Sequence, residues 1–157
     1  MAIVIVYDSI FGNTQKIAEA IAVGLAGKGE VRLVRVNDAA RLDLTDVDCL
    51  IVGSPTRGFN ATPSTSDFVE GLDAILAAAR KAAAFDTRLD PEDIKPAPLR
   101  WVVHAGGYAA DRIAAGLKRK GFTFLGEPEG FRVGGTEGPM KPGELERATA
   151  WAAALPI

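Results

Sequence analysis

The chain has 157 residues, a formal net charge of −2 and a hydrophobic content of 48%. This length and composition favour one globular domain over residues 1–157 and argue against a disordered chain. The near-neutral charge gives no sign of a nucleic-acid partner, and the single cysteine, Cys49, excludes a disulfide within the chain. The apolar run at residues 2–7 is too short to be a signal peptide or to cross a membrane. We therefore expect a cytoplasmic protein without membrane insertion.

Strand and helix patterns alternate along the first half of the chain. Residues 2–7 form a continuous apolar run, typical of a strand buried on both faces, and a helix follows. Residues 31–36 predict a strand near a sheet edge, and residues 49–53 predict a second buried strand. A helix is expected from Phe68 to Ala79, and a short strand over residues 81–85.

The second half continues the alternation. Residues 99–104 are ambiguous, because they resemble a strand by propensity but directly precede a helix expected around residues 109–120. Two short strand pieces, 122–125 and 131–133, come before a last helix that begins near Pro142. About five alternations predict an α/β fold: a doubly wound, five-stranded parallel sheet with helices on both faces.

Ligands of such folds bind at the carboxyl ends of the strands, where the strand order reverses. Residues 8–14 connect the first strand to a helix N-terminus, whose free backbone N–H groups and dipole attract anions. Gly12 permits close approach of a ligand, and Ser9, Asn13 and Thr14 offer further donors. The alternative is an ordinary strand-to-helix turn with Asn13 or Thr14 near the cap.

Two more polar segments follow predicted strands. Residues 53–64 are too long and polar for a simple connection, and Phe59 either packs onto the core or walls a planar ligand. After the strand at 81–85 come Asp86, Thr87 and Arg88. Asp86 and Arg88 either form a local ion pair of little energetic value or contact a heterocycle with their neighbours.

These three segments resemble the three flavin mononucleotide (FMN) loops of the flavodoxin family. The resemblance covers essentially the whole chain, including the stretch GFRVGGTEGPMKPGELERATAWAAAL near the C-terminus. The family's phosphate loop is Ser/Thr-x-Thr-Gly-x-Thr, and residues 9–14 are Ser-Ile-Phe-Gly-Asn-Thr. The resemblance implies the flavodoxin-like strand order 2-1-3-4-5 and FMN as the cofactor. The residues that it assigns to FMN are Ser9, Ile10, Phe11, Gly12, Asn13, Thr14, Pro55, Thr56, Arg57, Gly58, Phe59, Asp86, Thr87 and Arg88.

The resemblance also implies a function, an electron-transport flavoprotein that exchanges electrons with a redox partner protein or a small acceptor. We expect no catalytic side chain and no metal site, because the cofactor carries the chemistry. Two departures, Phe11 in place of a hydroxyl residue and the lack of a tyrosine in the third loop, leave open a binding or regulatory module without flavin. Arg57 and Arg88, expected near the flavin ring, leave open an FMN-dependent oxidoreductase acting on a small acceptor such as a quinone. A phosphotransfer receiver domain is disfavoured, because no acidic residue follows the strand at 49–53. The sequence leaves the oligomeric state open.

Overall fold

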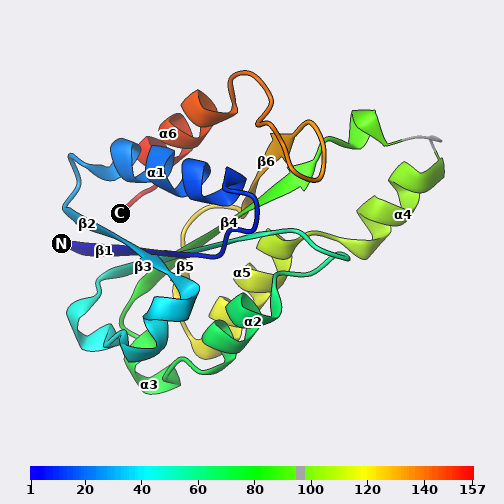
Figure 1. Cartoon of the computed structure of the whole chain (residues 1–157). Helices are drawn as coiled ribbons and strands as arrows, with labels where there is room; N and C mark the ends of the chain where they lie inside the picture. Colours follow the sequence, from blue (N-terminus) through cyan, green and yellow to red (C-terminus); the bar gives the residue numbers. More distant parts are fainter. Residues whose placement is uncertain (95–97) are drawn as a thin grey trace.

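The computed structural model describes residues 1–94 and 98–157, and these residues form an α/β structure (Figure 1). The first half of the chain, in order, comprises strand β1 (Ala2–Tyr7), helix α1 (Asn13–Leu25), strand β2 (Glu30–Arg35), the 3₁₀ turns η1 (Val36–Arg41) and η2 (Leu44–Asp46), strand β3 (Cys49–Pro55), and helices α2 (Pro63–Glu70) and α3 (Ala74–Ala77). The second half comprises strand β4 (Lys81–Leu89), the 3₁₀ turn η3 (Pro91–Asp93), helices α4 (Pro98–Gly106) and α5 (Ala109–Lys120), strands β5 (Thr123–Phe124) and β6 (Glu129–Val133), and helix α6 (Glu144–Ala154).

All strand pairs of the sheet are parallel, and the order is β2-β1-β3-β4-β5, with β6 also paired to β4. Strand β5 pairs with the beginning of β4, where Lys81 lies opposite Thr123. Strand β6 pairs with the end of β4, from Phe85 opposite Glu129 to Leu89 opposite Val133. The two short strands are therefore two halves of one fifth strand, and the predicted order 2-1-3-4-5 is confirmed.

Helices cover both faces of the sheet, with α1 and α6 on one side and α2 and α5 on the other (Figure 1). Successive side chains of β1 point to opposite faces, so Ile3 and Ile5 join the core under α1 and α6. Val4 and Val6 join the core on the other face. Burial on both sides explains why this strand is a continuous apolar run rather than an alternating one.

The strand predicted at residues 81–85 is longer than its sequence suggests. Strand β4 continues to Leu89, so Asp86, Thr87 and Arg88 lie in a strand and not in a loop. The extension has a partner, because Asp86 lies opposite Gly130 and Arg88 opposite Arg132 in β6. Pairing with β6 supplies hydrogen bonds to the backbone of this polar segment, and the sequence-based boundary was wrong for that reason.

The helix expected from Phe68 to Ala79 was also placed wrongly. Helix α2 already begins at Pro63, because the Thr62 hydroxyl accepts a hydrogen bond from the Thr65 N–H as an N-cap, and proline suits the first turn. It ends at Glu70, and the separate helix α3 is capped by the carboxylate of Asp73. What was one predicted helix is therefore two.

The ambiguous residues 99–104 belong to helix α4, which projects from the side of the molecule (Figure 1). Pro98 occupies the first position of this helix, a place that suits proline. The strand-like propensity reflects apolar side chains that are exposed, among them Leu99, Val102 and Trp101, the last with 84% of its surface accessible. Propensity alone was a poor guide, because these side chains do not pack in a sheet.

Candidate functional site

The carboxyl ends of β3 and β4 and the N-terminus of α1 surround a cavity of about 190 Å³. It lies at the edge where the strand order reverses, since β1 sits between β2 and β3. The residues that line it are Ile10, Phe11, Asn13, Thr14, Pro55, Thr56, Arg57, Gly58, Thr87, Arg88, Leu89, Val133 and Thr136. Most of the predicted site residues therefore meet at one cavity. The exceptions among the described residues are Ser9, Gly12, Phe59 and Asp86.

The loop before α1 leaves backbone donors available. Gly12 has a φ of 92°, a conformation that favours glycine, and a Cβ built there would meet nothing within 4 Å. The N–H groups of Asn13 and Thr14 lie in the first turn of α1, and neither has an acceptor among the described residues. The Ser9 Oγ accepts hydrogen bonds from the N–H groups of Gly12 (3.1 Å) and Gln15 (3.3 Å) and closes the loop. Its own proton remains available for an acceptor.

Two side chains of α1 connect the loop to other elements. Asn13 donates from Nδ2 to the carbonyl of Glu137 at 3.1 Å, which joins α1 to the segment after β6. The Thr14 hydroxyl, which is buried, lies 2.8 Å from the Thr87 hydroxyl of β4. The two threonines therefore couple the helix N-terminus to the strand end, and either can donate to a ligand in place of its partner.

The segment after β3 forms a tight turn. Arg57 and Asn60 exchange two backbone hydrogen bonds, with N···O distances of 2.8 and 3.0 Å. Phe59 within this turn has a φ of 69°, which is uncommon for a bulky residue. Its ring lies against Gly106, where a Cβ would be 2.4 Å from the ring. Phe59 is thus half-buried against helix α4, and Arg57 is exposed to solvent.

Thr56 ties this turn to the rest of the site. Its N–H donates to the Thr87 carbonyl at 2.9 Å, and its hydroxyl accepts from the N–H of Ala109 at 3.0 Å. The turn is therefore fixed both to β4 and to the N-terminus of α5. The second contact could not be predicted from the sequence, because it is made by the backbone of Ala109.

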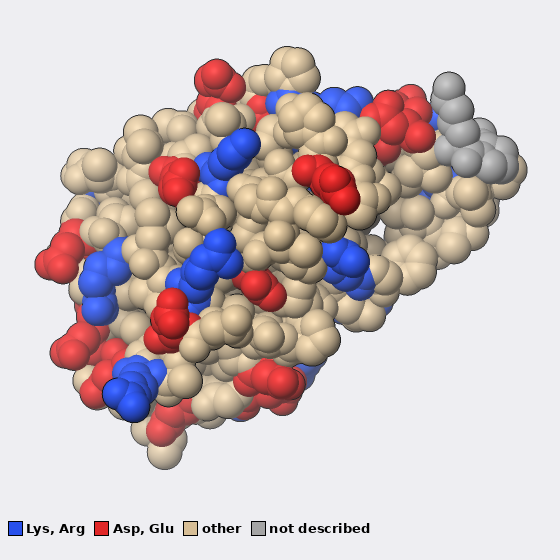
Figure 2. Space-filling model, viewed as in Figure 1, with Lys and Arg blue, Asp and Glu red and all other residues tan. Residues whose placement is uncertain are grey.

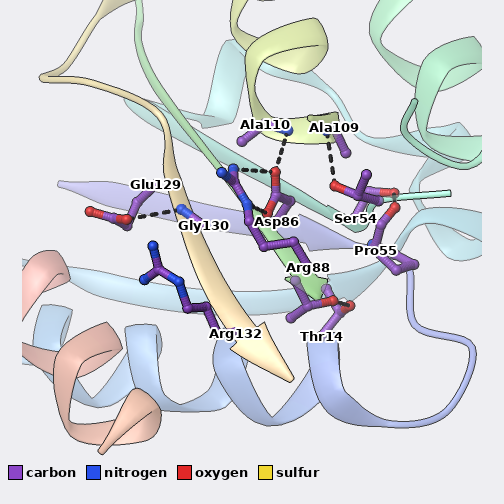
Figure 3. Close-up of polar contacts among 12 residues, drawn as sticks. Thr14, Ser54, Pro55, Asp86, Arg88, Ala109, Ala110, Glu129, Gly130 and Arg132 are labelled. Carbon is purple, nitrogen blue, oxygen red and sulfur yellow. Dashed lines mark hydrogen bonds and ion pairs between the residues drawn. The ribbon is translucent and has the colours of Figure 1, made fainter. Parts of the chain in front are cut away.

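Asp86 and Arg88 form an internal ion pair beside the cavity (Figure 3). Arg88 donates from Nε and Nη2 to the two carboxylate oxygens, each at 2.7 Å, and the Ala110 N–H donates to Oδ2 at 2.9 Å. The guanidinium lies 3.6 Å from the centroid of the Tyr108 ring. A Cβ on Gly130 would be 2.1 Å from the Arg88 Nε, so only glycine leaves room for this arrangement.

Burial and pairing act in opposite directions on Asp86. Its side chain is fully buried, which raises the pKa of the carboxyl, while the hydrogen bonds and charge of Arg88 and the Ala110 N–H oppose that rise. A local ion pair of little energetic value was one of the two interpretations of the sequence, and it applies to exposed pairs, which are weak because water screens them. This pair is shielded from water, and Asp86 offsets the charge that Arg88 brings to the cavity.

Sequence reasoning missed several residues at this edge. Leu89, Val133 and Thr136 line the cavity because β4 extends and pairs with β6. Arg35 reaches the loop from the end of β2, where it lies opposite Tyr7 in the sheet. Arg35 could have been predicted at the site only from the strand order, because it ends the strand that lies next to β1.

The single cysteine of the chain is a core residue. Burial raises the pKa of the Cys49 thiol to about 12, so it behaves as an inert core group. Among the side chains that the structure describes, no three histidine, cysteine, aspartate or glutamate residues are grouped to hold a metal ion. No helix in residues 1–94 and 98–157 combines the length and the apolar character needed to cross a membrane.

Comparison with known proteins gives relatives over part of the chain. An uncharacterized protein of Methanocaldococcus jannaschii, MJ0732, is 37% identical over 87 residues, which are 52% of this chain and 22% of that protein. A flavodoxin of Aquifex aeolicus is 46% identical over 58 residues, 35% of this chain and 31% of that protein. The chain thus spans between about a fifth and a third of the length of these curated relatives.

The fold is shared with solved structures over nearly the whole chain. A flavodoxin from the domain Archaea superposes with a TM-score of 0.71 at 20% identity, covering 98% of this chain and 94% of that one. At this level of identity the likeness shows the fold alone. The model of the flavodoxin domain family matches residues 4–98, which is more than half of the sequence. The chain belongs to the flavodoxin domain family.

Proposed function

We propose that this protein binds FMN in the cavity at the end of β1, β3 and β4 and acts in electron transfer. The observation that carries the proposal is the N-terminus of α1, where the N–H groups of Asn13 and Thr14 have no acceptor in the described part of the chain and lie beside an open glycine. A phosphate ester suits such a place, because backbone donors and the helix dipole stabilise an anion. The hydroxyls of Ser9 and Thr14 would add two further donors.

The rest of the cavity suits a flat heterocycle. Residues 56–58 and residues 87–89 both line it, and they are neighbours, because the Thr56 N–H donates to the Thr87 carbonyl. Gly58 has a φ of 54° with no atom within 4 Å of a built Cβ, so its backbone can lie close to a ring.

Three apolar side chains at the cavity are exposed: Ile10, Phe11 and Leu89, with 43–49% of their surface accessible. Their apolar surface favours contact with a ring or with a docked partner. The sequence-based role of Phe59 as the aromatic wall stays a prediction. Phe11 is a second candidate for that role, because its ring lines the cavity while the ring of Phe59 packs against Gly106.

FMN, when bound, supplies one- and two-electron chemistry, and the residues of this chain bind it, orient it and limit its contact with water. The partner would be a redox protein or a small acceptor. Positive and negative side chains are interspersed over the face drawn in Figure 2. That face therefore offers no strong single-sign field to steer a charged partner. A cytoplasmic location remains part of the proposal.

The reductase alternative has less support from the structure than from the sequence. It depended on two cations near the ring, but Asp86 neutralises Arg88 and water screens the exposed Arg57. The alternative of a domain without flavin makes a clear contrary prediction. It expects a colourless protein, whereas the proposed function expects absorption bands in the blue and the near ultraviolet.

The test is the absorption spectrum of the purified chain, before and after incubation with excess FMN and removal of free flavin. The mass of the compound released by heat identifies the cofactor. We expect flavin bands and the mass of FMN at about one equivalent per chain. A protein that retains no flavin after this treatment would refute the proposal.

A further inference from the structure

Arg35, at the end of β2, brings a positive charge to the loop before α1, residues 8–12. Its Nη2 donates to the Gln15 Oε1 at 2.7 Å, and its Nη1 lies 3.5 Å from the Ser9 carbonyl oxygen. The guanidinium carbon lies 5.5 Å from the centroid of the Tyr7 ring. Three groups from the same loop region therefore hold this side chain against the loop, although it remains exposed to solvent.

Each of these groups is neutral. Among the ion pairs of the described residues, none joins Arg35 to a carboxylate. Two acids lie close to the loop, but both contact other groups. Asp8 accepts hydrogen bonds from the Ser9 N–H and the Thr62 hydroxyl, and Glu19 accepts from the Gln15 Nε2. The charge of Arg35 is therefore not offset by a direct partner, in contrast to that of Arg88.

The position of this charge relates it to the anion site. The side chain of Gln15 accepts a hydrogen bond from Arg35, and the backbone N–H of Gln15 donates to the Ser9 Oγ. Arg35 therefore contacts Ser9 and Gln15, two residues that also form the loop before α1. The charge thus contacts the loop that carries these donors, and exposed charges interact over a Debye length of about 8 Å at physiological salt. It would also counter Asp8, whose carboxylate at the start of the loop repels an anion.

We propose that Arg35 strengthens the preference for a phosphorylated flavin over an unphosphorylated one by supplying the positive charge that the loop itself lacks. This inference rests on the proposed function and identifies a further residue of the same site. It predicts that the preference for FMN over riboflavin depends on salt, because the charge is exposed. Hydrogen bonds from the backbone alone would give a preference that salt changes much less.

The experiment is a titration of flavin-free protein with FMN and with riboflavin, followed by quenching of flavin fluorescence at low and high NaCl. Four proteins are compared: wild type, Arg35→Gln, Arg35→Lys and Arg32→Gln. Arg32 is a matched control, since it is exposed on the same strand and makes no hydrogen bond or ion pair with the described residues of the loop. Thermal unfolding of each variant checks that the fold is retained.

We expect Arg35→Gln to weaken FMN binding about three- to fivefold at low salt, the effect of losing one exposed charge pair, and to leave riboflavin binding unchanged. Arg35→Lys should keep most of the preference, and Arg32→Gln all of it. If wild type prefers FMN and Arg35→Gln keeps the same preference and salt dependence, the role of Arg35 is refuted while FMN binding stands. If wild type binds neither flavin, both proposals fail.

Discussion

The Arg88 guanidinium donates two hydrogen bonds to the Asp86 carboxylate, each with an N···O distance of 2.7 Å. The two residues are two positions apart in β4, so their side chains leave the same face of the strand and can meet. The carboxylate is fully buried and the guanidinium is stacked on Tyr108. This pair therefore stabilises the strand end that forms one wall of the cavity.

Loss of either partner should destabilise the fold. Removing one member of a buried ion pair costs about 3–5 kcal/mol, because the other charge is left buried without compensation. We expect losses of this size in the free energy of unfolding for Asp86→Ala and Arg88→Ala, measured by urea denaturation. The exposed Arg57→Ala is the control, with a change within about 0.5 kcal/mol. Equal and small effects for all three variants would show that the pair contributes little.

The same pair should set the charge felt by a bound flavin. A fully reduced flavin tends to become an anion, which a nearby uncompensated cation stabilises. Asp86→Asn removes the compensating charge while keeping the shape of the side chain, so we expect it to raise the second reduction potential of the FMN-loaded protein. Arg57→Gln should change that potential much less, because solvent screens the side chain. Spectroelectrochemical titration measures the second reduction potential of each variant. Shifts of the same size in the two variants would contradict the role of Asp86 in neutralising Arg88.

The Thr14 hydroxyl should contribute to cofactor binding through its contact with Thr87. Thr14→Ala removes a donor at the helix N-terminus and leaves the Thr87 hydroxyl without its partner at 2.8 Å. We expect FMN affinity to fall by about 1–3 kcal/mol, the cost of an unsatisfied buried polar group. Fluorescence titration of flavin-free protein provides the value, and Thr123→Ala at the far end of the sheet is the control. An unchanged affinity in Thr14→Ala would move the phosphate site away from α1.

Glu144 should govern part of the acid sensitivity. Burial alone raises the pKa of this carboxyl, but hydrogen bonds from Arg147 and the Arg132 N–H outweigh it and hold the pKa below the ordinary 4.5. A carboxyl whose pKa is lower in the folded state stabilises the fold above its unfolded pKa, and this contribution is lost as pH falls below about 4.5. Glu144→Gln should flatten the loss of stability as the pH falls below about 4.5.

The control for this prediction is Glu146→Gln, which changes an exposed acid in the same turn of α6. Thermal unfolding of wild type and both variants, recorded at several pH values, separates the two positions. A wild-type pH profile that Glu144→Gln leaves unaltered would show that other carboxyl groups dominate acid unfolding.

The sheet was predictable because its signals are local. Buried runs such as the one at residues 2–7 mark parallel strands, and the loops that follow them mark the site. The end of β4 was missed, because Asp86 and Arg88 are typical of loops until Gly130 is known to lie opposite. Arg35 was missed for the same reason, since its place at the loop depends on strand order. The start of α2, in contrast, has a local signal, and Thr62 followed by Pro63 could have predicted it.

The most direct test of the account is an experimental structure of the chain with FMN bound. We expect the phosphate within hydrogen-bonding distance, about 3 Å, of the N–H groups of Asn13 and Thr14. The ring should lie against residues 56–58 and residues 87–89, which line the cavity. A flavin whose phosphate lies elsewhere, or whose ring lies outside this cavity, would contradict the account.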